Sequence, residues 1–571
     1  MSVKAEPIQP EIHIVDYQQL PPYTRVLSVG SDSKVDKNRA RMLIVPKEKV
    51  SELVALGLPD RRFFILSSEM ELRSPDWYFL ISKGKTLGLE FAGYATASAE
   101  VFDLINRQQA QPVSETAKQD ARVIDQIVTK SQPLEWFRGI VQRCLLVGAS
   151  DIHLELRNGV ATLRVRLDGM MRHLAGYPAQ VALEGISAAY TVLAEERSRT
   201  EVAFNASVAQ AAMIPLDLPQ QRLTLRYQSH PAVGGFDVVI RILKSSGSST
   251  QSRILTLDKL GFTEWQVNQL EGAMGSAWGG LFIAGITGSG KTTTLNTLLA
   301  SLTRNASRKL ITIEDPVEYE LPGVTYMSIQ RKAENAAGSD PFHAAMLAFL
   351  RMDPDVGLFG EIRDQVSAQM AQAAIQTGHK ILSTVHATSA LGIISRLSSD
   401  GIGLKRQDLC SPEFISALVY QVLVPINCPH CKIPAREVMS PEALQVYTTA
   451  FGLNPDTIYC ASDSGCGHCR KPGIDYSASE RNGTSGVKVG AEIIVPDGRM
   501  LEMLTTGRDM EARRYWRSRQ AEGFASADMD GKEAWGHVLF DVSEGTVDPY
   551  YFERTFGSAA LLARSLQREA H

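Results

Sequence analysis

The chain has 571 residues, of which 44% are hydrophobic and 21% charged, and its formal net charge at pH 7 is −4. This composition indicates an ordinary globular protein of about three or four domains, and the absence of a long basic block argues against a dedicated nucleic-acid binder. The N-terminal segment MSVKAEPIQPEIHIVDYQQL has no basic part followed by an apolar part, so no signal peptide is predicted. The longest apolar stretch, ISALVYQVLVPI, is shorter than the roughly 20 residues that cross a bilayer. We therefore expect a cytoplasmic protein that contacts a membrane only through partners.

The first half of the chain divides at changes of composition. Residues 1–105 contain the predicted strands RRFFILS and WYFLISKGKTLGLEF. A polar, Gln-rich linker is predicted over 106–130, and a Gly/Ser/Thr-rich one over 245–255. Between them, residues 131–244 begin with the amphipathic LEWFRGIVQRCLLVGA and continue with alternating strands DIHLEL, ATLRVRL, RLTLRY and FDVVIRIL. This pattern predicts a mixed α+β domain.

Strands and helices alternate over residues 256–425. The strands are LFIAGI, KLITI, VGLFG and KILSTV, and the helices between them include KTTTLNTLLASL and QVSAQMAQAAIQ. Such alternation predicts an α/β domain with a mostly parallel sheet and helices on both faces. The C-terminal residues, from MLEMLTTGRDMEARRYW to YYFERTFG, are predicted to be helical.

The segment GITGSGKTTT, residues 285–294, matches the phosphate-binding pattern G-x-x-x-x-G-K-S/T between a strand and a helix. Glycines let backbone N–H groups close around phosphates, and the following helix adds the partial positive charge of its N-terminus. Lys291 is predicted to reach the β- and γ-phosphates of ATP, and the hydroxyl of Thr292 to coordinate Mg²⁺. The residues predicted to bind the nucleotide are Gly285, Thr287, Gly288, Ser289, Gly290, Lys291, Thr292 and Thr293.

Acidic residues follow two later strands. ITIEDPVEYE carries Glu314, Asp315 and Glu318, and VGLFGEIRD carries Glu361 directly after its last glycine. Ligands bind at the carboxyl ends of parallel strands, so an acid there faces the crevice and can orient water or hold a metal. The alternative for each is a solvated acid at the start of a loop.

Two histidines bracket another strand in QTGHKILSTVHATSA, namely His379 and His386. An isolated histidine is usually structural, but two beside a strand next to a phosphate loop favour a functional role.

Four of the seven cysteines form two C-x-x-C pairs, NCPHCKIP (Cys428 and Cys431) and GCGHCRKPG (Cys466 and Cys469). Two such pairs in a cytosolic chain suit tetrahedral zinc ligation by thiolates. Disulfides are disfavoured in a reducing compartment, and redox chemistry is disfavoured because there are two pairs and no thioredoxin-like setting. Four thiolates leave no open coordination position, so we expect a structural metal and a small subdomain between the pairs, within residues 426–490. The remaining cysteines are expected to be buried or incidental: Cys144, Cys410 and Cys460.

In order and spacing, GITGSGKTTT, TIEDPVEYE, DPDVGLFGEIRD and TGHKILSTVHATSA resemble the four nucleotide-site boxes of the type II secretion and type IV pilus assembly ATPases. Upstream, ASDIHLE followed by RVRLDG resembles that family's second N-terminal domain, and LDKLGF its lead-in to the ATPase core. The likeness covers residues 130–475 approximately. It implies a RecA-like P-loop ATPase core (256–425) preceded by a PAS-like α+β domain (131–244), with a zinc-binding insert (426–490) and a helical C-terminus (491–571).

The resemblance also implies roles for single residues. Glu361 matches the Walker B glutamate that polarises the attacking water, and Glu318 the functional glutamate of the acidic box. His379 and His386 match the histidine box, which senses the γ-phosphate. Arginines of the PAS-like domain would reach the nucleotide of a neighbouring subunit, and the candidates are Arg166, Arg226 and Arg241. A salt bridge within its own domain is an equally open role for each arginine.

By the same resemblance, the protein would be a homo-hexamer that uses ATP, Mg²⁺ and Zn²⁺ and acts through an inner-membrane platform protein. The four-cysteine insert is characteristic of the assembly motors and is lacking in the retraction motors. Residues 1–105 would dock on a platform or secretin-side partner. Two alternatives remain, a nucleic-acid motor or recombinase with a zinc ribbon and a scaffold that does not hydrolyse ATP. Residues 426–490 contain six basic and six acidic residues, a net charge of zero, which disfavours a DNA-gripping ribbon.

Overall fold

The computed structural model describes residues 13–14, 25–30, 43–45, 52–58, 62–68, 74–86, 88–99, 101–102, 105, 133–218, 221–244, 255–303, 307–315, 317, 320–329, 341–476 and 481–569. The chain divides into two compact units, Met1–Trp136 and Phe137–His571. The linker predicted over 106–130, and all of the one predicted over 245–255 except its last residue, lie outside the described residues. The finer domain boundaries stay a prediction. Where the structure describes the chain, none of its helices is both long and apolar enough to cross a membrane.

The first unit contains a five-stranded sheet with the order β1-β7-β6-β5-β2. A separate parallel pair, β3 and β4, and the helix α1 accompany it. The bounds are β1 His13–Ile14, β2 Arg25–Val26, β3 Ser28–Gly30, β4 Leu43–Val45, β5 Leu53–Gly57, β6 Arg62–Ser67, α1 Pro75–Thr86 and β7 Glu90–Ala97. The strand predicted at RRFFILS is confirmed as β6.

The second predicted strand of this unit, WYFLISKGKTLGLEF, is wrong over most of its length, because α1 occupies it. The hydroxyl of Ser74 accepts a hydrogen bond from the backbone N–H of Trp77 at 3.2 Å and so caps the start of the helix. Trp77, Leu80 and Ile81 are buried at the i, i+3, i+4 spacing of one helix face. The aromatic residues favour a strand locally, but the cap and this spacing decide for a helix.

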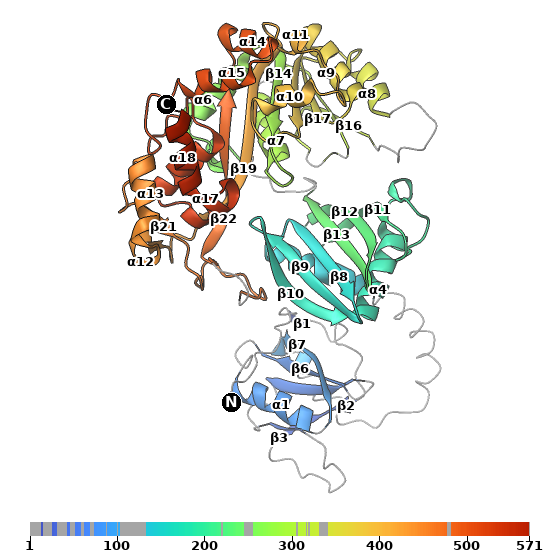
Figure 1. Cartoon of the computed structure of the whole chain (residues 1–571). Coiled ribbons are helices and arrows are strands. Elements are labelled where there is room, and N and C mark those ends of the chain that lie inside the picture. Colours follow the sequence, from blue (N-terminus) through green and yellow to red (C-terminus); the bar gives the residue numbers. More distant parts are fainter. Residues whose placement is uncertain are drawn as a thin grey trace. The chain divides into compact units, whose positions relative to one another are not determined.

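A six-stranded antiparallel sheet opens the second unit, with the order β10-β9-β8-β13-β12-β11 (Figure 1). The four predicted strands are confirmed as β8, β9, β12 and β13, whereas β10 and β11 were not predicted because their sequences alternate less regularly. The bounds are β8 Asp151–Arg157, β9 Val160–Leu167, β10 Met170–Pro178, β11 Gln210–Leu218, β12 Gln221–Ala232 and β13 Gly235–Lys244, with α4 Ala179–Ala188, a π-helix Ala189–Leu193, a 3₁₀ turn Glu196–Ser198 and helical residues 137–146. Its likeness to a PAS domain stays a prediction.

A seven-stranded sheet forms the centre of the second unit, with the order β16-β15-β17-β18-β14-β19-β22. Every neighbouring pair is parallel except β19 and β22, as the strand–helix alternation predicts. The strands are β14 Gly279–Ala284, β15 Leu310–Glu314, β16 Val324–Ser328, β17 Val356–Ile362, β18 Lys380–Val385, β19 Ile415–Asn427 and β22 Thr484–Ile494. The helices are α5 Leu257–Leu260, α6 Glu264–Gly275, α7 Lys291–Thr303, α8 Pro341–Phe349, α9 Gln365–Gln376, α10 Gly392–Leu397 and α11 Arg406–Leu409.

Alternate residues of each central strand pack against helices on opposite faces of this sheet. In β14, Leu281 and Ile283 share a core with Leu298 of α7. Phe282 between them belongs to a second core, which contains Ala371 of α9. Strands buried on both faces explain the nearly continuous apolar runs of the sequence.

The cysteine-bearing insert connects the C-terminal end of β19 to the N-terminal end of β22 (Figure 1, orange). It contains β20 Ile433–Pro434, α12 Ala435–Val438, α13 Pro441–Phe451 and β21 Tyr459–Cys460, and the C-terminal helices are α14 Gly498–Thr505, α15 Asp509–Arg517, α16 Ala534–Ser543, α17 Pro549–Phe556 and α18 Ala559–Glu569. Leu444 and Tyr447 of α13 share one core with Val538 of α16 and Phe552 of α17. The insert and the C-terminal helices therefore stabilise each other.

Candidate functional site

The phosphate loop lies between the end of β14 and the start of α7, at the carboxyl edge of the parallel sheet. Gly285, Gly288 and Gly290 have φ angles of 156°, 81° and 81°. A Cβ on Gly285 would lie 2.3 Å from the Ser289 hydroxyl and 2.4 Å from the carbonyl oxygen of Gln421. The first glycine of the motif is thus required by a close approach of the loop to β19.

The loop residues differ in exposure. Thr287 and Gly288 are exposed, Ser289 is buried, and Thr292 and Thr293 at the start of α7 are partly buried. The ammonium of Lys291 donates hydrogen bonds to the carbonyl oxygens of Gly285 (2.7 Å) and Ile286 (3.1 Å). The lysine therefore lies back over its own loop, where phosphate oxygens can replace these carbonyls as acceptors.

Two charged neighbours act on Lys291 in opposite directions. Burial lowers the pKa of Lys291, the negative charge of Glu361 raises it, and the positive charge of Arg241 lowers it further. The lysine therefore lies within electrostatic range of both the acid at the end of β17 and an arginine of the antiparallel sheet.

Glu361 owes its direction to a β-bulge in β17. Phe359 pairs with Ser383 of β18, but Glu361 already pairs with Thr384, so Gly360 is the extra residue. The hydroxyl of Thr384 donates to the carbonyl oxygen of Gly360 at 2.7 Å and so holds the bulge. An extra residue reverses the side to which the following side chain points. The side chain of Glu361 is 37% exposed, which is open enough to meet a ligand.

His386 lies beside this glutamate. It follows the last residue of β18, and its Nε2 atom is 3.0 Å from Oε1 of Glu361. Both side chains therefore lie at the edge of the sheet that carries the phosphate loop, on neighbouring strands.

The structure does not bring His379 to this edge. His379 precedes β18, and its carbonyl oxygen accepts from the N–H of Gly279, the first residue of β14. Its ring contacts Phe349 at 5.9 Å between centroids, and Nδ1 lies 3.0 Å from the carbonyl oxygen of Ala374. A six-residue strand is about 20 Å long, so the two histidines of the motif lie at opposite edges of the sheet.

The acidic stretch after β15 is described only in part. Glu318 lies outside the described residues. Glu314 is the last residue of β15 and is 4% exposed, whereas Asp315 is exposed.

The three candidate arginines share one row of the antiparallel sheet. Arg226 pairs with Arg241, Arg241 with Asp151, and Asp151 with Arg166 across β12, β13, β8 and β9. Directly opposed residues lie on the same face of a sheet, so these side chains project from one surface. The sequence places the three arginines far apart, and only the register reveals the row.

Their contacts distinguish the three arginines. Nε of Arg241 donates to Asp151 at 2.9 Å. This contact is a salt bridge within the same domain, the role named above as the alternative to a catalytic one. Arg166 donates to the carbonyl oxygen of Gly169 at 3.1 Å. Arg226 is exposed, and its side chain makes no hydrogen bond or ion pair within the part of the chain that the structure describes.

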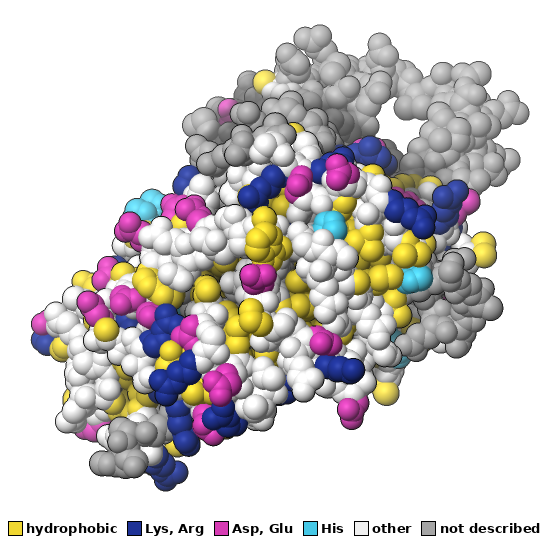
Figure 2. Space-filling model, turned by 90° about the horizontal axis from the view of Figure 1, so that it is seen from above, with side chains coloured by type: hydrophobic (Ala, Val, Ile, Leu, Met, Phe, Trp, Pro, Cys, Tyr) yellow, Lys and Arg dark blue, Asp and Glu magenta, His cyan; other side chains and the backbone are white. Residues whose placement is uncertain are grey.

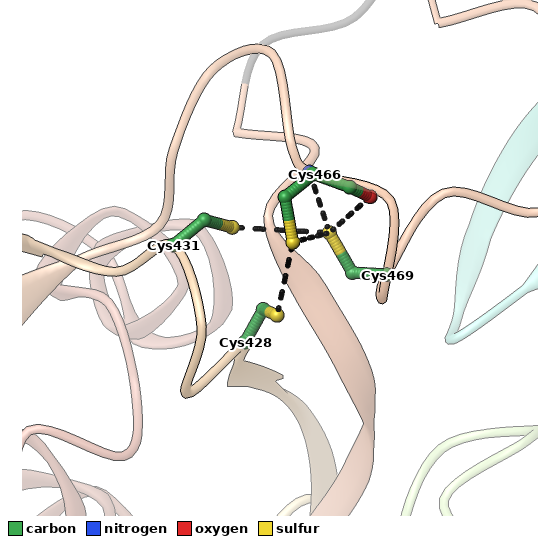
Figure 3. Close-up of side chains that lie close together, drawn as sticks. All are labelled: Cys428, Cys431, Cys466 and Cys469. Carbon is green, nitrogen blue, oxygen red and sulfur yellow. Dashed lines mark hydrogen bonds between the residues drawn. The ribbon is translucent and has the colours of Figure 1, made fainter.

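The four cysteines of the two C-x-x-C pairs converge on one point (Figure 3). Their sulfur atoms lie within 4.8 Å of one another, and the pairs Cys428–Cys466, Cys431–Cys469 and Cys466–Cys469 are each 3.8 Å apart. A tetrahedron with Zn–S bonds of about 2.3 Å has edges of about 3.8 Å. The separations therefore fit zinc. The other cysteines, Cys144, Cys410 and Cys460, are buried, as expected.

The surroundings act differently on the four cysteines: burial raises the pKa of Cys431 and Cys469, whereas the backbone favours the thiolate of Cys466. The N–H of Cys466 donates to the sulfur of Cys469 at 3.1 Å. The backbone N–H of His468 lowers the pKa of Cys466 to about 7, which favours the ligating form. A Cβ on Gly483 would lie 2.7 Å from the backbone nitrogen of Ser462 and 3.1 Å from the sulfur of Cys431, so a side chain there would crowd the site.

Residues 129–521 match the family described as "Type II/IV secretion system protein". The chain belongs to this family. As a secretion-system ATPase, it is an ATP-hydrolysing enzyme and uses ATP with Mg²⁺.

Individual relatives of this secretion-system ATPase include proteins of both systems. Type II secretion system protein E of Pseudomonas aeruginosa is 30% identical over 416 residues, which cover 73% of this chain and 72% of that protein. Type IV pilus assembly ATPase TfpB of Acinetobacter baylyi is 29% identical over 447 residues, covering 77% and 70%. The solved structure of the ATPase DotB of Legionella pneumophila has a TM-score of 0.48 and 16% identity, over 74% of this chain and 95% of that one.

Sequence reasoning missed two features of the sites. Gln421 is fully buried in the apolar strand ISALVYQVLVPI, and its side chain donates to the phosphate loop. The signal for it in the sequence was a single polar amide within an apolar run. His430 and His468 stack with their ring centroids 3.9 Å apart, one from each cysteine pair. Their signal was a histidine at the same place in CPHC and CGHC.

Proposed function

We propose that the chain is a homo-hexameric mechanochemical ATPase that powers assembly of a type IV pilus or a type II secretion pseudopilus through an inner-membrane platform protein. The observation that carries the proposal is the meeting of Lys291, Glu361 and His386 at one edge of the parallel sheet, beside the phosphate loop. Strand ends at such an edge are where α/β sheets bind their ligands. Family membership supplies the reaction, and this geometry supports the assignment of its groups.

Each group has a distinct task in hydrolysis. The ammonium of Lys291 leaves the carbonyl oxygens of Gly285 and Ile286 to bind the β- and γ-phosphates. Thr292, the second residue of α7, would hold Mg²⁺, which neutralises charge on the phosphates. Glu361 accepts a hydrogen bond from the attacking water, whose oxygen bonds to the γ-phosphorus as the bond to ADP breaks. His386, within hydrogen-bond distance of Glu361, contacts the γ-phosphate and reports its loss.

Arginines of the antiparallel sheet complete the site of a neighbouring subunit. Arg226 is the strongest candidate because it is exposed and, among the described residues, has no partner of its own. Arg241 and Arg166 stand in the same row and add positive charge to that surface. An arginine supplied in trans stabilises transition-state charge and makes turnover depend on the position of the next subunit. This dependence is what a ring motor requires.

The four-cysteine site would hold one structural Zn²⁺. Its donor set is four thiolates at tetrahedral spacing, so no position remains to activate water. The metal would fix the insert at the ends of β19 and β22, and the family resemblance assigns such an insert to assembly motors. The protein would lie in the cytoplasm, peripheral to the inner membrane through its platform partner, with residues 1–105 as a second docking region.

Two observations disfavour the alternative of a nucleic-acid motor. The insert has no net charge, whereas phosphate neutralisation supplies most of the affinity for DNA. On the face drawn in Figure 2, Lys and Arg side chains lie interspersed with Asp and Glu rather than gathered in a broad basic patch. The scaffold alternative does not apply, because the family hydrolyses ATP.

A pair of variants tests the assignment. Lys291→Ala is expected to lose ATP binding, whereas Glu361→Gln keeps binding and loses turnover, because one residue holds phosphates and the other orients water. Binding is measured by calorimetry and turnover by phosphate release, with each variant also tested for pilus or pseudopilus assembly in cells that lack the wild-type gene. Near-normal turnover in Glu361→Gln would refute the role of this glutamate.

A further inference from the structure

We propose that Gln421 is a positioning residue of the phosphate loop: its buried amide turns the peptide between Ser289 and Gly290 so that the N–H of Gly290 faces the nucleotide phosphates. The inference rests on the proposed function only in assuming that ATP occupies this loop.

The register of the sheet brings Gln421 under the loop. β19 lies parallel to β14, and Tyr420 pairs with Ala284, the last residue of β14. Gln421 therefore follows at the level where the phosphate loop begins. Its side chain has no exposed surface, so it acts from inside the core rather than from the nucleotide side.

One hydrogen bond fixes the direction of the loop peptide. Nε2 of Gln421 donates to the carbonyl oxygen of Ser289 at 2.6 Å, and this bond is buried. The C=O of Ser289 and the N–H of Gly290 belong to the same planar trans peptide and point in opposite directions. Because the oxygen is held against β19, the N–H of Gly290 points away from β19, toward the side where the nucleotide binds. Within the described chain that N–H donates to no backbone carbonyl, so it is available to a phosphate oxygen.

The first glycine of the motif depends on the same residue. A Cβ on Gly285 would lie 2.4 Å from the carbonyl oxygen of Gln421, and one on Gly290 would lie 3.4 Å from its Nε2 atom. The loop thus approaches Gln421 too closely for a side chain at its first glycine, and it lies at ordinary contact distance from Gln421 at its last. The close approach at Gly285 and the hydrogen bond to Ser289 together hold the loop against β19.

The alternative orientation of this peptide would weaken the binding of the nucleotide phosphates in two ways. The nucleotide would lose a hydrogen bond from a backbone N–H to a charged oxygen, and a carbonyl oxygen would face the phosphates instead. Gln421 therefore acts on the affinity that the β- and γ-phosphates supply and leaves the contacts to adenine and ribose unchanged.

The test compares Gln421→Met and Gln421→Glu with Gln266→Met in the full-length protein. Gln266 is an equally buried glutamine of the same domain, and its Nε2 atom donates to the carbonyl oxygen of Ala491 at 2.8 Å, away from the loop. Methionine keeps the volume and removes the donor. Glutamate also removes the donor and sets a negative charge beneath the phosphates.

Calorimetric titrations with ATP, ADP and AMP supply the readout. We expect Gln421→Met to lower the affinity for ATP and for ADP by about tenfold to a hundredfold, and so to reduce the ratio of ADP affinity to AMP affinity. Gln421→Glu should have a larger effect on both quantities. Gln266→Met is expected to lower the melting temperature but to keep that ratio. A Gln421→Met protein with the wild-type ratio would overturn the inference, even if its stability falls. Failure of the wild-type protein to bind ATP would instead overturn the proposed function.

Discussion

Replacing Arg226 by glutamine should separate catalysis from stability more cleanly than any other change in the arginine row. Arg226 is exposed and, in the described part of the chain, has no partner, so its loss should change the free energy of unfolding by less than about 0.5 kcal/mol. An arginine finger supplied in trans is worth about 10³- to 10⁵-fold in kcat. We therefore expect turnover to fall by at least about a thousandfold with an unchanged melting temperature.

The neighbouring arginines provide the comparison. Arg241→Gln leaves the carboxylate of Asp151, which is 7% exposed, without its guanidinium partner, so stability should fall by about 1–3 kcal/mol as well. Arg222 lies on the same strand as Arg226, and its side chain and that of its partner Asp217 are 64% and 81% exposed. Arg222→Gln is the matched control, and it should keep both turnover and stability.

Mixing two inactive variants tests whether the arginine acts between subunits. Arg226→Gln subunits keep Glu361, and Glu361→Gln subunits keep Arg226. In mixed rings at equal ratio, about a quarter of the interfaces would combine both intact groups, and phosphate release should return to about that fraction of wild type. Mixtures that stay as inactive as each variant alone would refute action in trans, and normal turnover of Arg226→Gln would refute any catalytic role.

Three further outcomes are expected. Replacing Cys428 and Cys431 by serine should release zinc, which contributes on the order of 10 kcal/mol in comparable sites, and abolish fibre assembly while ATP binding survives; metal analysis and calorimetry check this, and zinc-free wild-type protein would contradict it. His386→Ala should lower kcat with little effect on the melting temperature, whereas His379→Ala should lower the melting temperature and keep kcat, because only His386 lies beside Glu361; equal losses of kcat would contradict this placement. Burial lowers the pKa of Lys380 from 10.5 to about 7, so between these values the unfolded chain binds a proton that the folded chain does not, and stability should rise with pH relative to Lys380→Met. Urea titrations at pH 7 and 9.5 measure the free energy of unfolding of the two proteins. A difference in this free energy that is the same at both pH values would contradict the lowered pKa of Lys380.

The sequence by itself determined the elements with strong local signals. The phosphate loop has a fixed order of glycines, Lys291 and Thr292, and its flanking strand and helix follow from apolar periodicity. The two C-x-x-C pairs likewise predict a four-thiolate site, because each pair supplies two ligands from one tight turn. Residues close in sequence create both patterns, so local chemistry is enough to recognise them.

The tertiary structure alone decided which distant residues meet. His379 and His386 are equivalent in a motif, yet the direction of β18 sends them to opposite edges of the sheet. Arg166, Arg226 and Arg241 belong to three different strands, and only the strand register aligns them and gives Arg241 an acidic partner. Gln421 acquires its contact with the phosphate loop because β19 pairs with β14 across 130 residues of intervening chain, approximately. In each case the physical reason is the same: strand pairing is a long-range choice that the residues of a single segment do not encode.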